Sequence, residues 1–265
     1  MRCRLEHRLG ACRIGSHPRT PTAGHRSWAW RRVTGVISNT MYFEGAFEHP
    51  ARIVAKGRKM TIDFYFDFLS PYAYLAHRHL FAIAERTDAT VVLKPTLLAA
   101  LLNAHGHKGP AEIPPKREWV FKETARRAVL HGIPMGVPHT HPFNPLMALR
   151  AVHACPRDKK RALCDGFWAE AWGGAATQGL EHPDTIVRCA DNAGLDGAAL
   201  LAQIQTPALK SSFRAETATA LERGVFGVPT YCVDDELFWG FDALDLLELH
   251  LQGEDPLPSN LMAQL

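Results

Sequence analysis

Apolar and polar side chains alternate strictly between residues 61 and 68. Four apolar side chains occupy every second position of this segment: Ile62, Phe64, Phe66 and Phe68. Two aspartates and a tyrosine stand between them. Successive side chains of a β-strand point to opposite faces. The pattern therefore predicts a strand over 61–68 with one face in the core.

A helix is predicted directly after this strand. Ser70 is a favourable N-cap residue, and Pro71 suits the first helical position, where its missing N–H costs nothing. Apolar residues then recur at helical spacing, at Ala73, Ala76, Leu80, Ile83 and Ala84. A second strand is predicted at 89–95, and the β-α-β order indicates that the two strands are parallel.

The middle of the chain carries almost no strand signal. Prolines and capping residues at the starts of segments, and glycines at their ends, delimit a series of predicted helices. These helices lie within 114–133, 144–155, 157–174, 182–195, 196–205 and 207–224. We expect Asn144 to cap the second of them, with Pro145 at its first position, and Gly224 to follow the last.

Strand periodicity returns near the end of the chain. Residues 229–235 and 236–241 are predicted to form an antiparallel hairpin, and 243–252 a closing helix. The order β-α-β, helical block, β-β-α predicts an α/β protein with a thioredoxin-like fold, interrupted by a large all-helical insertion at about 97–224. We therefore expect one domain at 60–255.

The first sixty residues differ in charge from the rest. Residues 1–60 hold 12 of the 30 Lys and Arg residues but 3 of the 27 acidic residues, a net charge of +9, against −6 for the remainder. This argues against a nucleic-acid-binding domain. We expect residues 1–59 to be a poorly ordered basic extension. It is either a transit peptide or, as we favour, a segment upstream of a true start at Met60.

The remaining composition, 46% hydrophobic and 22% charged, is that of a soluble globular protein. No run approaches the roughly 18 consecutive apolar residues of a membrane span. The six cysteines show neither a Cys-x-x-Cys spacing nor a zinc pattern, and His105 and His107 lack a third ligand. We therefore expect a cytoplasmic protein with reduced thiols, no metal and no membrane partner, ending in a tail at 256–265.

Two motifs and the helical block between them carry a family resemblance. The motifs are "FDFLSPYAYLA" after the first strand and "GVFGVPTYCVDDELFWGFD" near the end. Together they resemble the DsbA-like branch of the thioredoxin superfamily. More narrowly, they resemble the 2-hydroxychromene-2-carboxylate isomerases and the kappa-class glutathione transferases. In that group a serine replaces the redox cysteine, and the resemblance assigns this position to Ser70.

A serine cannot exchange disulfides, which excludes oxidoreductase chemistry at Ser70. Its hydroxyl can donate a hydrogen bond to a thiolate that another molecule brings, and this lowers the pKa of the thiol. The resemblance implies that this molecule is glutathione. The alternative is that Ser70 is a plain N-cap, and the two roles are compatible.

The resemblance implies further contacts to glutathione. Pro229 is expected to follow a cis peptide bond, which leaves the backbone of Val228 free to pair with the cysteinyl unit. Asp242 would receive the γ-glutamyl end, although Ala243 follows where the family often has Arg; Asp242 as a cap of the last helix is the alternative. Asn103 and Lys116 are the remaining candidates, with Lys94 as another cation for the substrate carboxylate.

The implied reaction is the reversible interconversion of 2-hydroxychromene-2-carboxylate and trans-o-hydroxybenzylidenepyruvate, an aromatic carboxylate, in aromatic hydrocarbon degradation. Reversible addition of the glutathione thiolate to the double bond would permit rotation. The family also implies a homodimer. Two other functions stay open: a kappa-like glutathione transferase that conjugates electrophiles, and a non-catalytic thioredoxin-fold binding module. A serine hydrolase is disfavoured because no G-x-S-x-G elbow surrounds Ser70.

Overall fold

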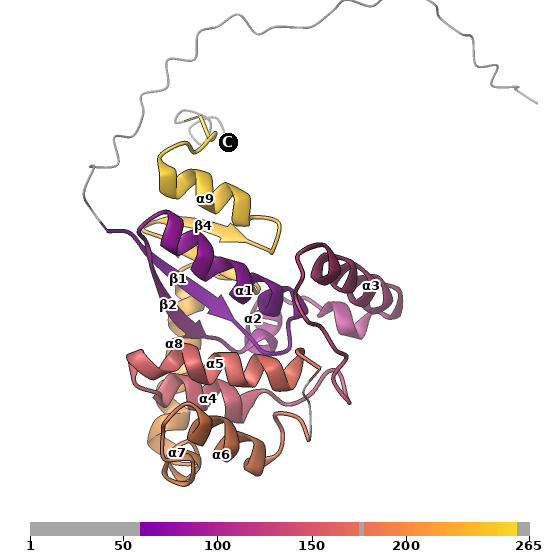
Figure 1. Ribbon diagram of the computed structural model, residues 1–265, viewed down its shortest axis with the longest axis vertical. Helices are drawn as coiled ribbons and strands as arrows, with labels where there is room; N and C mark the ends of the chain where they lie inside the picture. The colour runs from indigo at the N-terminus through magenta and orange to yellow at the C-terminus, as the bar shows by residue number, and fades with distance from the viewer. Residues whose placement is uncertain (1–58, 175–177, 259–265) are drawn as a thin grey trace, which may run out of the picture. The chain divides into compact units, whose positions relative to one another are not determined.

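The computed structural model describes residues 59–174 and 178–258 (Figure 1). The predicted basic extension, apart from Lys59, and the end of the predicted tail lie outside these ranges, so the expectations about them stay predictions. The described residues form a four-stranded sheet with helices packed on it.

The sheet is mixed, with strand order β2-β1-β3-β4. Strand β1 (Thr61–Phe66) pairs in parallel with β2 (Thr90–Pro95) and antiparallel with β3 (Thr230–Val233). Strands β3 and β4 (Glu236–Trp239) form an antiparallel hairpin, and Asp234 adopts a positive φ of 50° in its turn. The predicted parallel pair and the predicted hairpin are both confirmed.

Strand β1 is buried on both faces and ends two residues earlier than predicted. Ile62, Phe64 and Phe66 are fully buried, as their alternation indicated, and Tyr65 on the opposite face is 3% exposed. The strand stops because the chain turns: the Ser70 N–H donates to the Asp67 carbonyl oxygen at 3.0 Å. The buried Asp67 and its neighbour therefore belong to the corner between strand and helix.

Nine α-helices accompany the sheet within the described ranges, with one 3-10 helix, η1 (Pro110–Glu112). They are α1 (Pro71–Arg86), α2 (Leu98–Ala104), α3 (Pro114–Leu130), α4 (Leu146–Ala154), α5 (Arg157–Ala171), α6 (Pro183–Asn192), α7 (Gly197–Gln203), α8 (Pro207–Glu222) and α9 (Leu244–Gln252). The predicted thioredoxin-like order with a helical insertion between β2 and β3 is confirmed.

Two details of the helix prediction were wrong. Helix α2 was not predicted, because it has seven residues and its N-cap position, Leu97, makes no side-chain cap hydrogen bond. Helix α4 begins at Leu146 and not at Pro145. Asn144 still acts as a cap, since its Oδ1 accepts a hydrogen bond from the Leu146 N–H at 3.0 Å.

The hydrophobic core has two parts. The larger cluster includes the fully buried Phe64 and Phe66 of β1, together with apolar residues of α1, α4, α5 and α9. The smaller cluster contains Tyr65, Leu101, Ala220, Val225, Val228 and Cys232. Because Tyr65 alternates with Phe64 and Phe66, the two clusters lie on opposite faces of the sheet. In Figure 1, α4–α7 gather on the side of the molecule away from α9.

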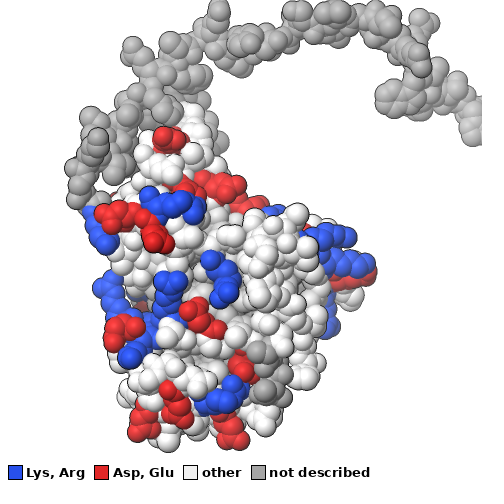
Figure 2. Space-filling view, in the orientation of Figure 1, with Lys and Arg blue, Asp and Glu red and all other residues white. Residues whose placement is uncertain are grey.

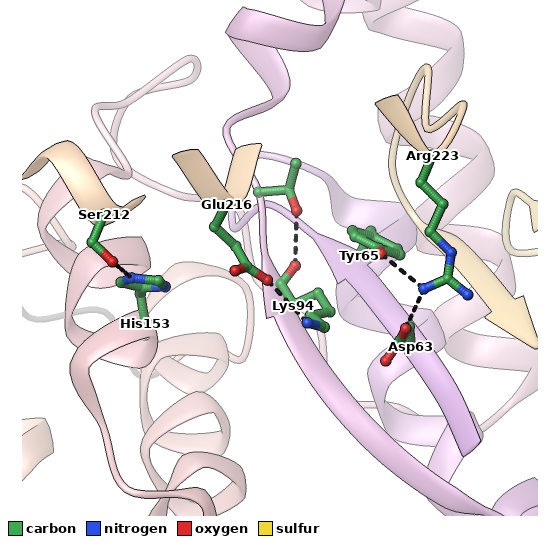
Figure 3. Close-up of polar contacts among 8 residues, drawn as sticks. Asp63, Tyr65, Lys94, His153, Ser212, Glu216 and Arg223 are labelled. Carbon is green, nitrogen blue, oxygen red and sulfur yellow. Dashed lines mark hydrogen bonds and ion pairs between the residues drawn. The ribbon is translucent and has the colours of Figure 1, made fainter. Parts of the chain in front are cut away.

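Polar contacts attach α8 to the sheet and to α4 (Figure 3). Arg223, directly after α8, forms an ion pair with Asp63 and donates to the Tyr65 hydroxyl at 3.3 Å. Glu216 pairs with Lys94 of β2 at 3.0 Å. Glu216 therefore faces a lysine of β2, and Arg223 faces an aspartate of β1. The two ion pairs together define the position of α8 along the sheet.

The surface carries mixed charge. On the face shown in Figure 2, basic and acidic side chains are interspersed over the coloured part of the molecule. Across residues 59–174 and 178–258, no helix is long and apolar enough to cross a membrane.

Candidate active site at the Ser70 corner

Ser70 caps α1. Its Oγ accepts a hydrogen bond from the Ala73 N–H at 3.2 Å, and the residue is 6% exposed. The hydroxyl proton points to the Val228 carbonyl oxygen at 3.5 Å, a long contact that a thiolate acceptor would replace. The corner also lies at the positive end of a 16-residue helix. A thiolate placed here would find both a donor and a favourable helix dipole.

The tertiary fold brings Val228 to Ser70. The Ser70 hydroxyl lies 3.5 Å from the Val228 carbonyl oxygen, at the long limit of a hydrogen bond. The Val228–Pro229 peptide bond is cis, as the resemblance implied. Thus the two motifs that carry the resemblance, far apart in the sequence, meet at one place.

The peptide N–H of Val228 is unpaired. Pairing between β1 and β3 ends at Tyr65 and Thr230, two residues beyond Val228. Within the described residues, nothing accepts a hydrogen bond from this N–H. An unpaired backbone donor next to Ser70 is available to an extended peptide-like ligand.

The side chain of Asp67 accepts two backbone hydrogen bonds at the corner. Its side chain is fully buried; Oδ1 accepts from the Leu69 N–H at 3.0 Å and Oδ2 from the Leu98 N–H at 2.8 Å. Burial raises the pKa of this carboxyl to about 7, against the opposing effect of the two hydrogen bonds. In the sequence, Asp67 is marked only as a polar position in the alternation of a strand. No local signal marks its partner Leu98, which follows the next strand.

Aromatic side chains from the helical insertion hold the same corner. His141 Nε2 lies 2.9 Å from the Leu69 carbonyl oxygen, and the Trp172 indole donates to the Phe68 carbonyl oxygen at 2.8 Å. The Phe121 ring packs edge-on against His141. Phe121 in turn lines an open groove of about 420 Å³, together with Ala111, Pro114, Arg117, Glu118 and Val137. An aromatic ring could lie in this groove, whereas Phe66 and Phe68 are fully buried in the core.

Asp242 does not cap the last helix. The N-cap residue of α9 is Ala243, and no side-chain cap hydrogen bond is formed there. Gly240 has a φ of 101°, and a Cβ on it would lie 2.6 Å from Asp242 Oδ1, so the carboxylate rests against a glycine backbone. Asp242 lines a cavity of about 230 Å³ with His79, Arg86, Arg127, His131, Phe241 and Asp245, among others.

Asp242 also acts electrostatically on the hydroxyl of Tyr72, two residues after Ser70. Burial raises the pKa of the Tyr72 hydroxyl, and the carboxylates of Glu123 and Asp242 add to the shift. The sequence-based choice of Asp242 as a ligand for an ammonium group stays a prediction.

The predicted Asn103 and Lys116 do not take part in the contacts between Ser70, Val228 and Ala73. Asn103 is exposed near the end of α2, and Lys116 is exposed in the first turn of α3. Within the described residues, neither side chain forms a hydrogen bond or an ion pair with Ser70 or Val228. Lys94, the other candidate cation, is held by Glu216 (Figure 3). These three roles stay predictions.

The four cysteines within the described ranges are free and buried, and the histidine pair is exposed. Burial raises the pKa of the Cys232 thiol, which packs in the smaller core cluster. His105 and His107 are exposed, with ring centroids 6.2 Å apart. In the part of the chain that the structure describes, no three His, Cys, Asp or Glu residues are grouped to hold a metal ion.

Comparison with known proteins agrees with this fold. Residues 61–252 match the family described as the DSBA-like thioredoxin domain. The chain is 34% identical over 195 residues to a 2-hydroxychromene-2-carboxylate isomerase from Sphingobium xenophagum, covering 72% of this chain and 97% of the relative. It is 28% identical over 223 residues to glutathione S-transferase kappa 1 from Rattus norvegicus, covering 77% and 97%.

A solved structure of a 2-hydroxychromene-2-carboxylate isomerase superposes with a TM-score of 0.67 at 28% identity, covering 73% of this chain and 95% of that one. The fold and the serine corner thus define a DsbA-like thioredoxin-fold protein with no cysteine in the redox position. The chain belongs to the 2-hydroxychromene-2-carboxylate isomerase family. The relatives that it matches are named as enzymes.

Proposed function

We propose that this chain is a glutathione-dependent isomerase that interconverts 2-hydroxychromene-2-carboxylate and trans-o-hydroxybenzylidenepyruvate. One observation carries the proposal. The Ser70 hydroxyl, at the start of α1, lies 3.5 Å from the carbonyl oxygen of Val228. The N–H of Val228 has no hydrogen-bond partner among the described residues. Sequence similarity to proteins named as 2-hydroxychromene-2-carboxylate isomerases supports this choice of reaction.

In this proposal the predicted residues supply partners for several polar groups of glutathione. The unpaired N–H and the nearby C=O of Val228 suit the two hydrogen bonds of an extended cysteinyl unit. The carboxylate of Asp242 suits the γ-glutamyl ammonium group, and Asn103 and Lys116 offer an amide and a cation for the glycyl carboxylate. In this proposal Ser70, Val228 and Pro229 form the centre of the site.

When bound, glutathione would supply a thiol that adds reversibly to a conjugated double bond, so that rotation about this bond becomes possible. The part of Ser70 is to donate its hydroxyl proton in a hydrogen bond, which favours the ionised thiol. A thiol has an unperturbed pKa of about 8.5, so a lowering by about two units makes it mostly thiolate at neutral pH. Lys116 or Lys94 would balance negative charge on the substrate.

A kappa-like glutathione transferase is the second candidate. It is favoured by the similarity to glutathione S-transferase kappa 1, which extends over 97% of that protein. The transferase needs the same Ser70 corner and differs in whether the conjugate persists. A non-catalytic binding module would keep the fold and lack dependence on Ser70.

The test is incubation of the purified chain with glutathione and trans-o-hydroxybenzylidenepyruvate, followed by absorbance and mass spectrometry. We expect isomerisation that requires glutathione and is lost in Ser70→Ala. Accumulation of a stable conjugate would replace the isomerase proposal with the transferase. Absence of any reaction together with no thermal shift on addition of glutathione would favour the binding module.

The proposal includes a homodimer in the cytoplasm. Helix α3 exposes apolar side chains that suit an interface, since Trp119, Val129 and Leu130 are 58%, 82% and 81% exposed. Sedimentation equilibrium tests the dimer, and a monomer at micromolar concentration would rule it out. Fractionation of cells tests the location.

A further inference from the structure

Asp67 is a fully buried carboxyl that the proposed chemistry leaves without a role. It lies three residues before Ser70, at the end of β1, and its relative exposure is 0%. A buried polar group is costly unless it is hydrogen-bonded. Both carboxyl oxygens of Asp67 are hydrogen-bonded, each to a backbone N–H.

The two hydrogen bonds join different parts of the fold. Oδ1 accepts from Leu69, the residue immediately before Ser70, at 3.0 Å. Oδ2 accepts from Leu98, the first residue of α2, at 2.8 Å. The N-cap residue of α2 provides no side-chain cap. Asp67, at the end of the adjacent strand β1, instead accepts from one of the first N–H groups of α2. One side chain therefore ties the serine corner to α2.

The electrostatic surroundings of Asp67 are simple. Its pKa is raised to about 7 by burial, and the hydrogen bonds from Leu69 and Leu98 oppose this. No charged side chain within the described ranges contributes to the shift. Lys94, near the end of β2, pairs with Glu216 within α8, and α1 presents the uncharged Ser70. His141 contacts the Leu69 carbonyl oxygen, and burial lowers its pKa, so its protonation is confined to the acid side of the range. The charge state of Asp67 therefore changes near neutral pH.

We propose that Asp67 is a positioning residue for Ser70, and that its ionised carboxylate holds the serine corner and α2 in one arrangement, which loosens when the carboxyl is protonated. The reason is that a hydrogen bond to a carboxylate is roughly twice as strong as one to a neutral group. Ser70 would feel the change through its neighbour Leu69. The inference concerns the site of the proposed function and rests on that function only for its effect on ligand binding.

An NMR titration of the wild-type chain from pH 5.5 to 8.5 tests the positioning directly. The amide protons of Leu69 and Leu98 should move downfield together as the pH rises, with one shared midpoint near 7. The Ala73 amide, which donates to Ser70 Oγ, should follow with the same midpoint. Different midpoints for Leu69 and Leu98, or an Ala73 amide that does not respond, would overturn the proposal.

Two variants and a non-titrating ligand extend the test to binding. In Asp67→Asn the amide can accept only one of the two N–H groups, so the shared titration should vanish. S-methylglutathione, which has no thiol, should bind the wild type roughly three- to tenfold more tightly at pH 8 than at pH 6, the range that one hydrogen bond supplies. Asp67→Asn should lose this dependence, whereas Asp63→Asn, on the same strand, should keep it.

The outcomes separate the two proposals. If S-methylglutathione binds at no pH while the three amides titrate together, the proposed function fails and the role of Asp67 stands. If the ligand binds with an affinity that is equal at pH 6 and pH 8, the role of Asp67 fails and the proposed function stands.

Discussion

Ser70 Oγ and the Val228 carbonyl oxygen lie 3.5 Å apart, although 158 positions separate the two residues in the sequence. The contact joins the first turn of α1 to the loop that precedes β3. It places a hydroxyl donor beside a peptide N–H that has no partner among the described residues. Activity should therefore depend on the hydroxyl of Ser70 and not merely on its ability to cap a helix.

Replacing Ser70 with Ala should lower kcat/KM roughly 10- to 100-fold, the effect of removing a hydrogen bond to a charged group. It should also lower the free energy of unfolding by about 1 kcal/mol, because the cap of α1 is lost. Steady-state kinetics and urea unfolding measure the two effects.

Thr206→Ala is the matched control for this variant. Thr206 caps α8, and its Oγ1 accepts from the Leu209 N–H at 3.3 Å. Its replacement should cost a similar free energy of unfolding and leave kcat/KM unchanged. Equal losses of activity in the two variants would mean that Ser70 acts only as a cap.

Asp242→Asn should raise the KM for glutathione roughly tenfold with little change in kcat, because a charge-assisted contact to the ammonium group becomes a neutral one. Asp245 lines the same cavity and lies in the first turn of α9. Asp245→Asn is therefore the control and should leave KM unchanged. A larger rise in KM for Asp245→Asn than for Asp242→Asn would mean that Asp245, and not Asp242, binds the ammonium group.

The contribution of His77 to the stability of the fold should fall as the pH drops from 7 to 5, whereas Asp67, whose pKa burial raises to about 7, contributes with the opposite sign. His77 is 1% exposed, and burial lowers its pKa despite the hydrogen bond to Asp165 at 2.7 Å. An unfolded histidine has a pKa of about 6.5, so below that pH the unfolded chain binds a proton before the folded chain does. The stabilisation is therefore complete above pH 6.5 and is lost as the pH falls toward the folded pKa.

Urea unfolding at pH 5, 6 and 7 measures this dependence. His79, His141 and His153 also have lowered pKa values because of burial, so they contribute with the same sign. His77→Gln should reduce the slope between pH 5 and pH 7. A variant with the wild-type slope would show that His77 accepts a proton in the folded state as readily as in the unfolded chain.

Arg223→Ala should destabilise the fold by about 1–2 kcal/mol, because it leaves the carboxylate of Asp63 and the Tyr65 hydroxyl without this partner. Arg86→Ala is the control. Arg86 bonds Glu248 through two nitrogens at 2.9 and 2.8 Å, but its side chain is 56% exposed, against 35% for Arg223. Exposed pairs contribute about 0–1 kcal/mol. Equal losses of stability in the two variants would therefore contradict a larger contribution from the contacts of Arg223 with β1.

Local patterns in the sequence were sufficient for most of the fold. The alternation at 61–68 identified β1 and its buried face, and Ser70-Pro71 identified the start of α1. Such signals are local because strand and helix periods and caps involve residues within a few positions of one another. Helix α2 was not predicted because its N–H at Leu98 is satisfied by Asp67, which lies at the corner after β1 and far from Leu98 in the sequence.

The sequence by itself determined the order of the strands and of the longer helices, the cap of α1 and the presence of a serine without a redox cysteine at the first corner. Only the tertiary structure decided which polar side chains meet. It paired Lys94 with Glu216 and joined Asp67 to both Leu69 and Leu98. The physical reason is that hydrogen bonds and ion pairs act over a few ångströms in space. Chain topology, which brings distant residues within that range, is not encoded in any single local pattern.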